Sequence, residues 1–179
     1  MEYWLTRKKV KNINLRLDRQ GRVQVSAPAG VPLERIDRFV QGHGEWLRQK
    51  QQQAAQRQQL AQTLPQPDRQ QAMELFCQVS QQVYPLFAQV LGGSPPELRV
   101  RQMRSRWGVC CPAKKRITLA LGLAALPLPL VEYVVLHEYC HFVHPDHQAG
   151  FWQLMCRWMP DAKARRKALA QWPCGPAGE

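Results

Sequence analysis

An apolar segment that leads directly into a cluster of histidines constrains this chain more than any other feature. Val131, Val134, Val135 and Leu136 recur at helical spacing, and four of the five histidines follow within residues 137–147. Prolines at 127 and 129 stand where the first turn of a helix tolerates them. A packed helix that presents polar residues at its end is the expected setting for a metal site, whereas a solvated histidine-rich surface would not need the apolar residues.

Two of these histidines have the spacing of metal ligands. In His137-Glu138-Tyr139-Cys140-His141, the imidazoles of His137 and His141 would project from one helix face, about one turn apart, and reach one ion. Zinc suits such a pair, and Glu138 can lean toward a metal-bound water without ligating the metal. We predict two zinc ligands and a general base here. The competing interpretation is that histidines on an apolar helix are satisfied core residues.

A third ligand must follow, because catalytic zinc usually has three protein ligands and one position for water. His144, Asp146 and His147 compete for this role. Pro145 disfavours helical geometry at the residue before it, so the helix should end near Val143 and the chain should turn back. This favours His147, which stands ten residues after His137, as in the longer zincin motif. In that motif a glycine makes the turn where this chain has His144, which with Asp146 stays an alternative.

The N-terminal half predicts a hairpin and helices. Apolar and polar residues alternate over 13–27 around a turn at 18–21, which predicts a β-hairpin within residues 1–30. A helix should begin after Pro32. Glutamine dominates from residue 49 onward, and we predict an exposed helical insert or linker over 49–67.

The C-terminal half predicts an α+β arrangement. After Asp68 as N-cap, a helix should run past a kink at Pro85. Residues 98–103 and 116–120 predict two strands joined by a loop that carries Trp107 and Gly108. The strand pair and the metal-binding helices occupy 97–172, and the 179 residues fit one domain.

Charge and targeting signals limit the partners. The 25 Lys and Arg exceed the 13 Asp and Glu, for a net charge of +12, which favours nucleic acid, nucleotides or anionic surfaces. The start has no apolar run of signal-peptide length, so we expect a cytoplasmic protein with reduced cysteines. The apolar stretch 117–136 is interrupted by Pro127, Pro129 and Glu132, so no membrane span is expected. No Cys-x-x-Cys pair is present, which disfavours a cysteine-based zinc module. The oligomeric state is not predicted.

Several segments resemble the YgjP-like metallopeptidase family, which is related to the WLM and SprT-type zinc proteases. They are Arg104–Cys110, Arg116–Leu119, Tyr133–His141, His147 with Phe151-Trp152, the hairpin at 12–28 and the helix after Pro32. The resemblance spans nearly the whole chain except the glutamine-rich middle and the tail.

The resemblance implies a zincin-like α+β fold, with a small antiparallel sheet and the N-terminal hairpin packed on the active-site helix. It also implies zinc bound by His137, His141 and His147, Glu138 as catalytic base, and a peptide or protein substrate. Val109 and Tyr139 depart from the family pattern, where serine and leucine are common, but they leave the ligands untouched. The resemblance also suggests that the loop with Trp107 borders the site, although we favour a packing role for Trp107. Phe151 and Trp152 should brace the segment bearing His147.

Two other functions remain open. A metal-activated hydroxide also attacks phosphoanhydrides, so a nucleotide pyrophosphohydrolase is one alternative, although no Gly-rich phosphate loop is present. The other is a nucleic-acid-binding module with a structural zinc, supported by basic residues near the strand pair. These residues are Arg101, Arg104, Arg106, Lys114, Lys115 and Arg116.

Overall fold

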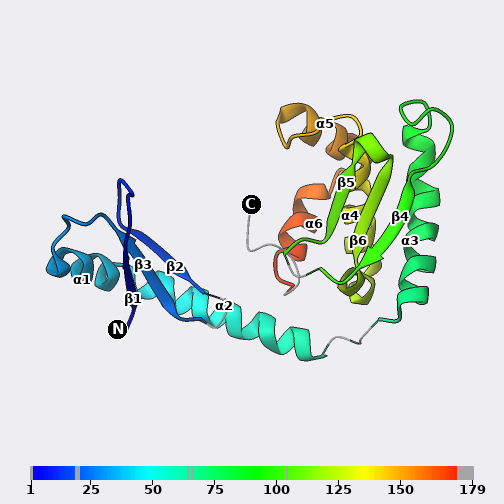
Figure 1. Ribbon diagram of the computed structural model, residues 1–179. Helices are drawn as coiled ribbons and strands as arrows, with labels where there is room; N and C mark the ends of the chain where they lie inside the picture. Colours follow the sequence, from blue (N-terminus) through cyan, green and yellow to red (C-terminus); the bar gives the residue numbers. More distant parts are fainter. Residues whose placement is uncertain (1, 19–20, 64, 66, 104, 173–179) are drawn as a thin grey trace. The chain divides into compact units, whose positions relative to one another are not determined.

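The structure is a computed structural model that describes residues 2–18, 21–63, 65, 67–103 and 105–172 (Figure 1). The chain divides into two compact units, Met1–Gln59 and Leu60–Glu179, where the length predicts a single domain. The physical reason is that each unit encloses its own cluster of buried apolar side chains. Arg104 and the tail from Pro173 lie outside the described residues.

The N-terminal unit is a three-stranded sheet with two helices. The strands β1 (Trp4–Arg7), β2 (Asn14–Leu17) and β3 (Val23–Ala27) have the order β1-β3-β2. β2 and β3 form an antiparallel hairpin where the alternating pattern predicts one, and β1, which the pattern does not reveal, pairs parallel to β3. Helices α1 (Leu33–Gly42) and α2 (Gly44–Thr63) follow, and α2 begins before and covers most of the predicted glutamine-rich helix.

The apolar side of this hairpin is covered from within its own unit. Val23 and Val25 of β3 are buried together with Ile36 and Val40 of α1 and Leu47 of α2. Alternate residues of a strand face the same side, so these valines point inward while their neighbours face solvent. The sequence predicts that the hairpin packs on the histidine-bearing helix; within its own unit the hairpin packs on α1 and α2.

The C-terminal unit begins with a capped helix. The Asp68 carboxylate accepts hydrogen bonds from the backbone N–H groups of Gln70 (2.8 Å) and Gln71 (3.1 Å) at the start of α3 (Arg69–Val83). This is the predicted N-cap. The helix ends where a kink was predicted, because Pro85 has no N–H to continue it, and a 3₁₀ turn, η1 (Tyr84–Phe87), follows.

A mixed sheet forms the centre of this unit. Its strands β4 (Glu97–Arg101), β5 (Gly108–Cys111) and β6 (Arg116–Ala120) have the order β4-β6-β5, with short 3₁₀ turns η2 (Pro112–Lys114) and η3 (Leu121–Ala125) beside β6. β4 is parallel to β6 and β5 is antiparallel to it, so the small sheet predicted as antiparallel is mixed. The segment predicted as a loop with Trp107 and Gly108 contains the edge strand β5, which reverses the chain before β6.

The helix that carries the histidine motif lies against this sheet. α4 (Leu128–Cys140) packs on β5, β6 and α3, and the short helices α5 (Ala149–Trp158) and α6 (Ala162–Leu169) pack on it in turn (Figure 1). Most of its side chains are buried, as the continuous apolar run predicts. None of the helices in the described part of the chain is long and apolar enough to cross a membrane.

Candidate metal centre

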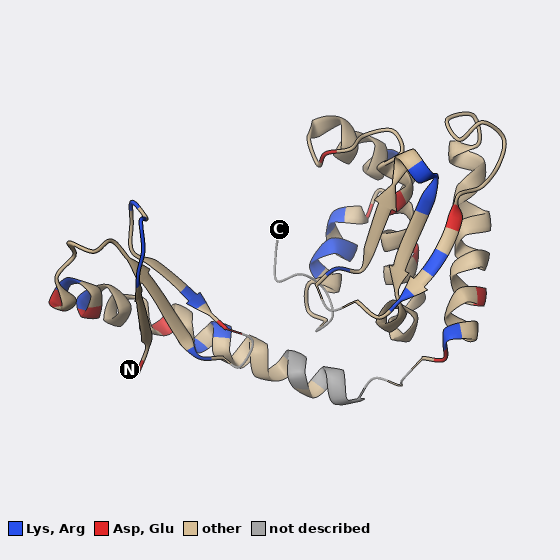
Figure 2. Cartoon of the chain, in the orientation of Figure 1, with Lys and Arg blue, Asp and Glu red and all other residues tan. Residues whose placement is uncertain are grey.

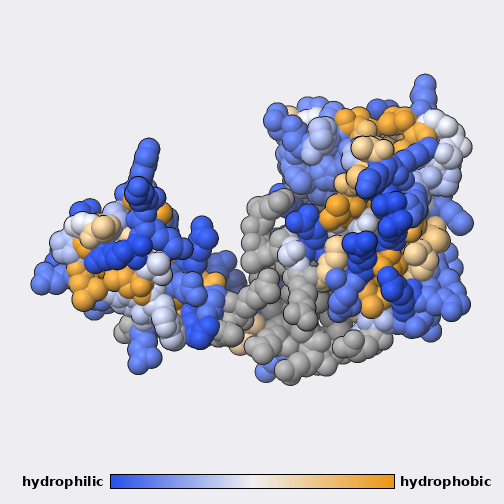
Figure 3. Space-filling view, in the orientation of Figure 1, coloured by the Kyte–Doolittle hydropathy of each residue, from blue (hydrophilic) through white to orange (hydrophobic). Residues whose placement is uncertain are grey.

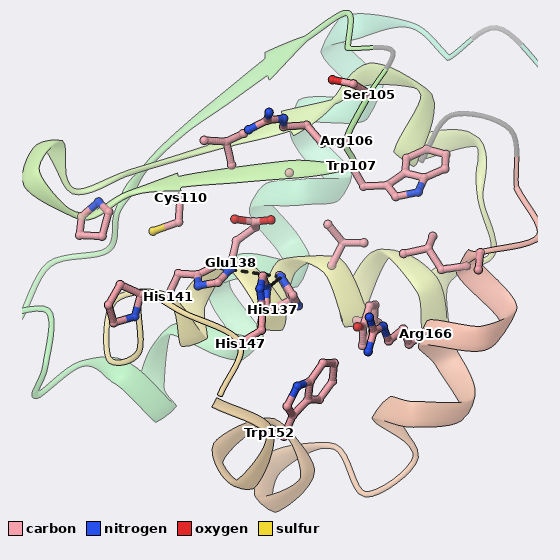
Figure 4. A pocket seen from close by; sticks show the side chains of 18 residues that line it. Ser105, Arg106, Trp107, Cys110, His137, Glu138, His141, His147, Trp152 and Arg166 are labelled. Carbon is pink, nitrogen blue, oxygen red and sulfur yellow. Dashed lines mark hydrogen bonds between the residues drawn. The ribbon is translucent and has the colours of Figure 1, made fainter. Parts of the chain in front are cut away.

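Three histidines from two segments converge in the C-terminal unit. His137 lies in α4, His141 directly follows that helix, and His147 lies just before α5. Ring nitrogens of all three lie within 4.8 Å of one another. The Nε2 atom of His137 is 3.2 Å from Nε2 of His141 and 3.0 Å from Nε2 of His147 (Figure 4). This is the triad that the sequence favours, with the nitrogens placed to hold one ion between them.

A turn after α4 brings the third histidine back. The helix ends at Cys140, three residues earlier than predicted, and a turn closes with the N–H of Val143 donating to the carbonyl of Cys140 at 3.0 Å. His144 also donates its N–H to this carbonyl, at 2.9 Å. Pro145 disfavours helical geometry at His144, the residue before it, so the chain leaves the helix here as predicted.

The two rival ligands take part in this turn and are not in the triad. The imidazole of His144 packs on Gly150, where an added Cβ would lie 2.8 Å from its Cε1 atom. The carbonyl of His144 accepts a hydrogen bond from Nδ1 of His141 at 3.0 Å, which makes Nε2 of His141 the ring nitrogen that can bind an ion. Asp146 accepts the N–H of Gln148 at 3.2 Å.

One aromatic ring supports the whole triad. Phe151 is completely buried, and its ring centroid lies 4.8 Å from that of His137, 4.9 Å from His141 and 4.8 Å from His147. Trp152 packs against Phe151 at 5.4 Å and lies 6.5 Å from His147. The predicted bracing of the His147 segment therefore extends to all three histidines.

His137 is held in the state that a metal requires. Burial, followed by the nearby His141 and His147, lowers the pKa of His137 to about 3, so its ring is neutral at neutral pH and keeps a lone pair for an ion. Its Nδ1 atom is buried with no hydrogen-bond partner among the described residues. The site therefore offers nitrogen donors in an apolar surrounding, and this set fits a metal such as zinc.

Glu138 points into the same cleft from α4 and is only 5% exposed (Figure 4). Burial raises the pKa of Glu138 to about 8, against the opposing effects of a hydrogen bond from the Cys110 backbone and the charge of Arg106. A carboxyl whose pKa lies near neutrality is suited to take up and release a proton.

Gly108 leaves the space that this carboxyl group occupies. A Cβ atom at Gly108 would lie 2.7 Å from both Cγ and Cδ of Glu138 and closer still to Oε1. Any residue larger than glycine at position 108 would therefore displace Glu138. The sequence predicts Gly108 only as part of a loop. No local pattern shows that position 108 requires glycine, because the reason is a contact with Glu138, 30 residues further along the chain.

The other motif residue, Tyr139, faces away from the cleft. It is completely buried, its hydroxyl lies 2.6 Å from Oγ of Ser80, and its ring packs on Phe87 at 5.4 Å. This departure from the family pattern therefore fixes α4 on α3 and does not shape the cleft wall.

A cleft of about 550 Å³ opens over the triad and Glu138. One wall is the edge strand β5 with the preceding Arg106 and Trp107, and the other includes Tyr133 of α4 and Arg166 of α6 (Figure 4). Trp107 is 5% exposed, which agrees with a packing role at the border of the cleft. The guanidinium of Arg166 lies 5.0 Å above the ring of Trp152.

Two of the basic residues near the strand pair are held by partners within the C-terminal unit. Arg116 donates from Nε to Glu97 at 2.7 Å, and the Lys115 ammonium donates to the carbonyl of Leu91 and the hydroxyl of Ser94. Both charges are thus engaged within the unit. Arg104 lies outside the described residues.

Comparisons with known proteins match a family model and a solved structure. The chain matches the family model described as "YgjP-like, metallopeptidase domain" over residues 11–76 and 54–172. It is also similar to a solved structure, the metallopeptidase zymogen of Pyrococcus abyssi abylysin, with 19% identity and a TM-score of 0.43 over 55% of this chain and 91% of that chain. That TM-score is too low to support any inference about this chain. No curated protein matches.

Proposed function

This chain belongs to the YgjP-like metallopeptidase family, and from that premise we propose that it is a zinc peptidase in which His137, His141 and His147 bind the metal and Glu138 is the general base. The family resemblance and the α+β fold class predicted from the sequence are confirmed, and membership makes the protein a metal-dependent peptidase in general. The observation that carries the finer proposal is the approach of three histidine Nε2 atoms beside a buried carboxyl group.

The donor set supports zinc over magnesium. Three imidazole ligands are typical of zinc sites, while magnesium prefers oxygen ligands and keeps several waters. Three protein ligands also leave a coordination position open, as catalytic sites do and closed structural sites do not. The geometry therefore gives more support to a catalytic zinc than to a structural zinc or a magnesium-dependent nucleotide hydrolase.

Glu138 supplies the proton transfers. A zinc ion bound here would lower the pKa of its water and polarise the carbonyl of the scissile peptide bond. The Glu138 carboxylate would accept the proton from the attacking water and then donate it to the leaving amine. The N–H of Cys110 donates to this carboxylate and orients it, while burial makes it a stronger base than an exposed glutamate.

The edge strand β5 supports a peptide as the substrate. Within the described residues β5 pairs with β6 on one side and lines the cleft on the other. An extended peptide can add to such an edge as a further strand, so that backbone hydrogen bonds place it along the cleft. The scissile bond would then run past Glu138, which lies against this strand at Gly108.

The zinc-loaded Glu138→Gln variant tests this proposal. We expect full zinc occupancy by elemental analysis and at least about a 100-fold loss of peptide hydrolysis, the usual contribution of a general base. Glu132→Gln is the matched control, since Glu132 lies on the same helix but pairs with Arg165 at 2.7 Å and does not line the cleft. Undiminished hydrolysis by zinc-loaded Glu138→Gln would remove Glu138 from this role.

The same preparations separate the alternative activities. Phosphate release from nucleoside triphosphates is measured beside peptide cleavage for the wild type and both variants. Phosphate release that depends on Glu138, with no peptide cleavage, would replace the peptidase by the pyrophosphohydrolase. A zinc ion bound by four protein ligands in a zinc-loaded crystal would instead favour a nucleic-acid-binding module with a structural zinc.

A further inference from the structure

We propose that the outer face of the β1-β3-β2 sheet binds single-stranded nucleic acid. The strand register defines this face. Residues of β1, β3 and β2 that pair side by side form two rows, and alternate residues of each strand point to the side opposite the buried valines. The rows are Trp4-Gln24-Arg16 and Thr6-Ser26-Asn14.

A tryptophan stands exposed on this otherwise polar face. Trp4 is 56% exposed, although large aromatic side chains are usually buried at least in part. The guanidinium of Arg22 lies 5.0 Å above its ring, and the Nε atom of Arg22 is held by Asp18 at 2.7 Å. The indole is therefore supported on one side by a fixed cation and open to solvent over the rest, which suits stacking of a base.

Further basic side chains lie across the sheet from this tryptophan and beyond the far end of its strand. Arg16 is exposed on β2, and Lys8, Lys9 and Lys11 are exposed in the connection from β1 to β2 (Figure 2). Arg7, in contrast, is tied to the carbonyls of Pro28 and Val31 and helps to close the loop.

Acidic residues offset only part of this charge. Asp18 pairs with Arg22, and Glu2 precedes β1. The space-filling view shows hydrophilic side chains at the connection from β1 to β2, while hydrophilic and hydrophobic side chains are both visible over the rest of this unit (Figure 3). The remaining lysines and Arg16 are positioned to contact phosphates along a strand that crosses the sheet.

The shape of the face favours a single strand over a duplex or a membrane. A sheet face with one exposed aromatic ring can stack on an unpaired base, whereas a duplex keeps its bases inside its own stack. A membrane surface requires a set of apolar side chains on one face, but the neighbours of Trp4 across the strands are Gln24 and Arg16. The excess of Lys and Arg in the whole chain, with a net charge of +12, provides the complementary charge.

Binding of a fluorescein-labelled 12-nucleotide oligouridylate to the full chain, followed by anisotropy, tests the role of Trp4. We expect Trp4→Ala to raise Kd about five-fold or more, the effect of losing one stacked base. Trp46→Ala is the matched control, because Trp46 is 41% exposed but lies on α2, which packs on the other side of the sheet. Equal Kd values for wild type and Trp4→Ala, with unchanged circular dichroism, would overturn the proposal.

A charge-matched pair of double variants tests the phosphate contacts. Arg16→Ala with Lys9→Ala should reduce the slope of log K against log salt by about 1.4, because each single-strand phosphate that a basic side chain neutralises adds about 0.7 to that slope. Arg35→Ala with Arg38→Ala removes the same charge from exposed positions of α1 and should leave the slope unchanged. The same slope change in both double variants would contradict a defined binding face.

Two competitor probes decide the class of partner. A 12-base-pair duplex of matched sequence should bind the wild type more weakly than the single strand, without dependence on Trp4. Vesicles of phosphatidylserine and phosphatidylcholine should show no binding that depends on Trp4. A preference for either probe that disappears in Trp4→Ala would overturn the assignment to single-stranded nucleic acid. Peptide hydrolysis does not enter these measurements, so the result is independent of the proposed peptidase.

Discussion

The two sheets of this chain have the same strand order and directions but different surroundings. In each, the first strand is parallel to the third, which is central, and the second strand is antiparallel at the other edge. The N-terminal sheet is covered on one face by a small cluster around Ile36 and Val25. The C-terminal sheet is part of a far larger buried cluster that includes residues of the helices α3, α4, α5 and α6.

This difference gives a physical reason why, among the described residues, the candidate metal centre accompanies the C-terminal sheet. Burying a carboxyl group such as Glu138 costs several kcal/mol unless it is compensated, and a small unit has little stability to spare. The larger core of the C-terminal unit can tolerate that cost. The topology is shared, so the chemistry depends on the residues that the covering helix brings to the edge strand.

Removal of the metal should produce the largest difference between the two units. With a chelator we expect complete loss of peptide hydrolysis, because the proposed reaction needs the ion. A ligand present at about 1,000 times its Kd contributes about 4 kcal/mol of stability, so hydrogen exchange should accelerate in residues 128–147. Exchange in residues 14–42 is the internal control and should not change. Equal acceleration in both units would contradict a metal bound only by the triad.

Two buried isoleucines test the independence of the units. Ile36 of α1 and Ile117 of β6 are both completely buried, and replacing either by alanine should cost about 2–5 kcal/mol. We expect Ile36→Ala to accelerate hydrogen exchange in residues 4–42 only, and Ile117→Ala in residues 97–169 only. If each variant destabilises both units equally, the chain unfolds as one cooperative domain.

Two glycines sharpen the comparison at the level of single atoms. Gly108→Ala places a Cβ against Glu138, and we expect about a 100-fold lower kcat, since a displacement of about 1 Å can cost that much. Gly42→Ala, at the end of α1, meets nothing within 4 Å and should be neutral or stabilise by up to about 1 kcal/mol. Steady-state kinetics and thermal unfolding measure both. Unchanged kinetics in Gly108→Ala would show that Glu138 has room to move.

Two tyrosine hydroxyl groups should give the smallest effects. Tyr139→Phe removes a buried contact of 2.6 Å with Ser80 and should lower the free energy of unfolding by about 1–2 kcal/mol. Tyr3→Phe removes a bond of the same length to Asp37 that is only partly buried, and its cost should be smaller because water can hydrogen-bond to Asp37 in place of the hydroxyl. Chemical denaturation measures both, and a larger cost for Tyr3→Phe would contradict this order.

Local patterns in the sequence predicted a large part of the fold and the approach of the three histidines. The helical spacing of His137 and His141 and the effect of Pro145 act over a few residues, so they can be recognised without the fold. The capping of α3 by Asp68 and the hairpin of β2 and β3 are local in the same way. The roles of these histidines in binding zinc stay a prediction.

Contacts between distant segments could not be predicted in this way. The strand β5 has only four residues. Its composition does not predict a strand, and it becomes one through its pairing with β6. The need for glycine at position 108 depends on Glu138, and the position of His144 outside the histidine triad depends on its packing against Gly150. The division into two units likewise depends on which apolar side chains meet in space.

The ring of Phe151 has a consequence for the thermodynamics of metal uptake. Three imidazoles that contact one buried ring have little rotational freedom before an ion arrives. An ion that enters such a site orders few side chains, so less conformational entropy is lost on binding. A smaller residue at position 151 would therefore weaken metal affinity without touching a ligand atom, and it would do so mainly through a less favourable entropy of binding.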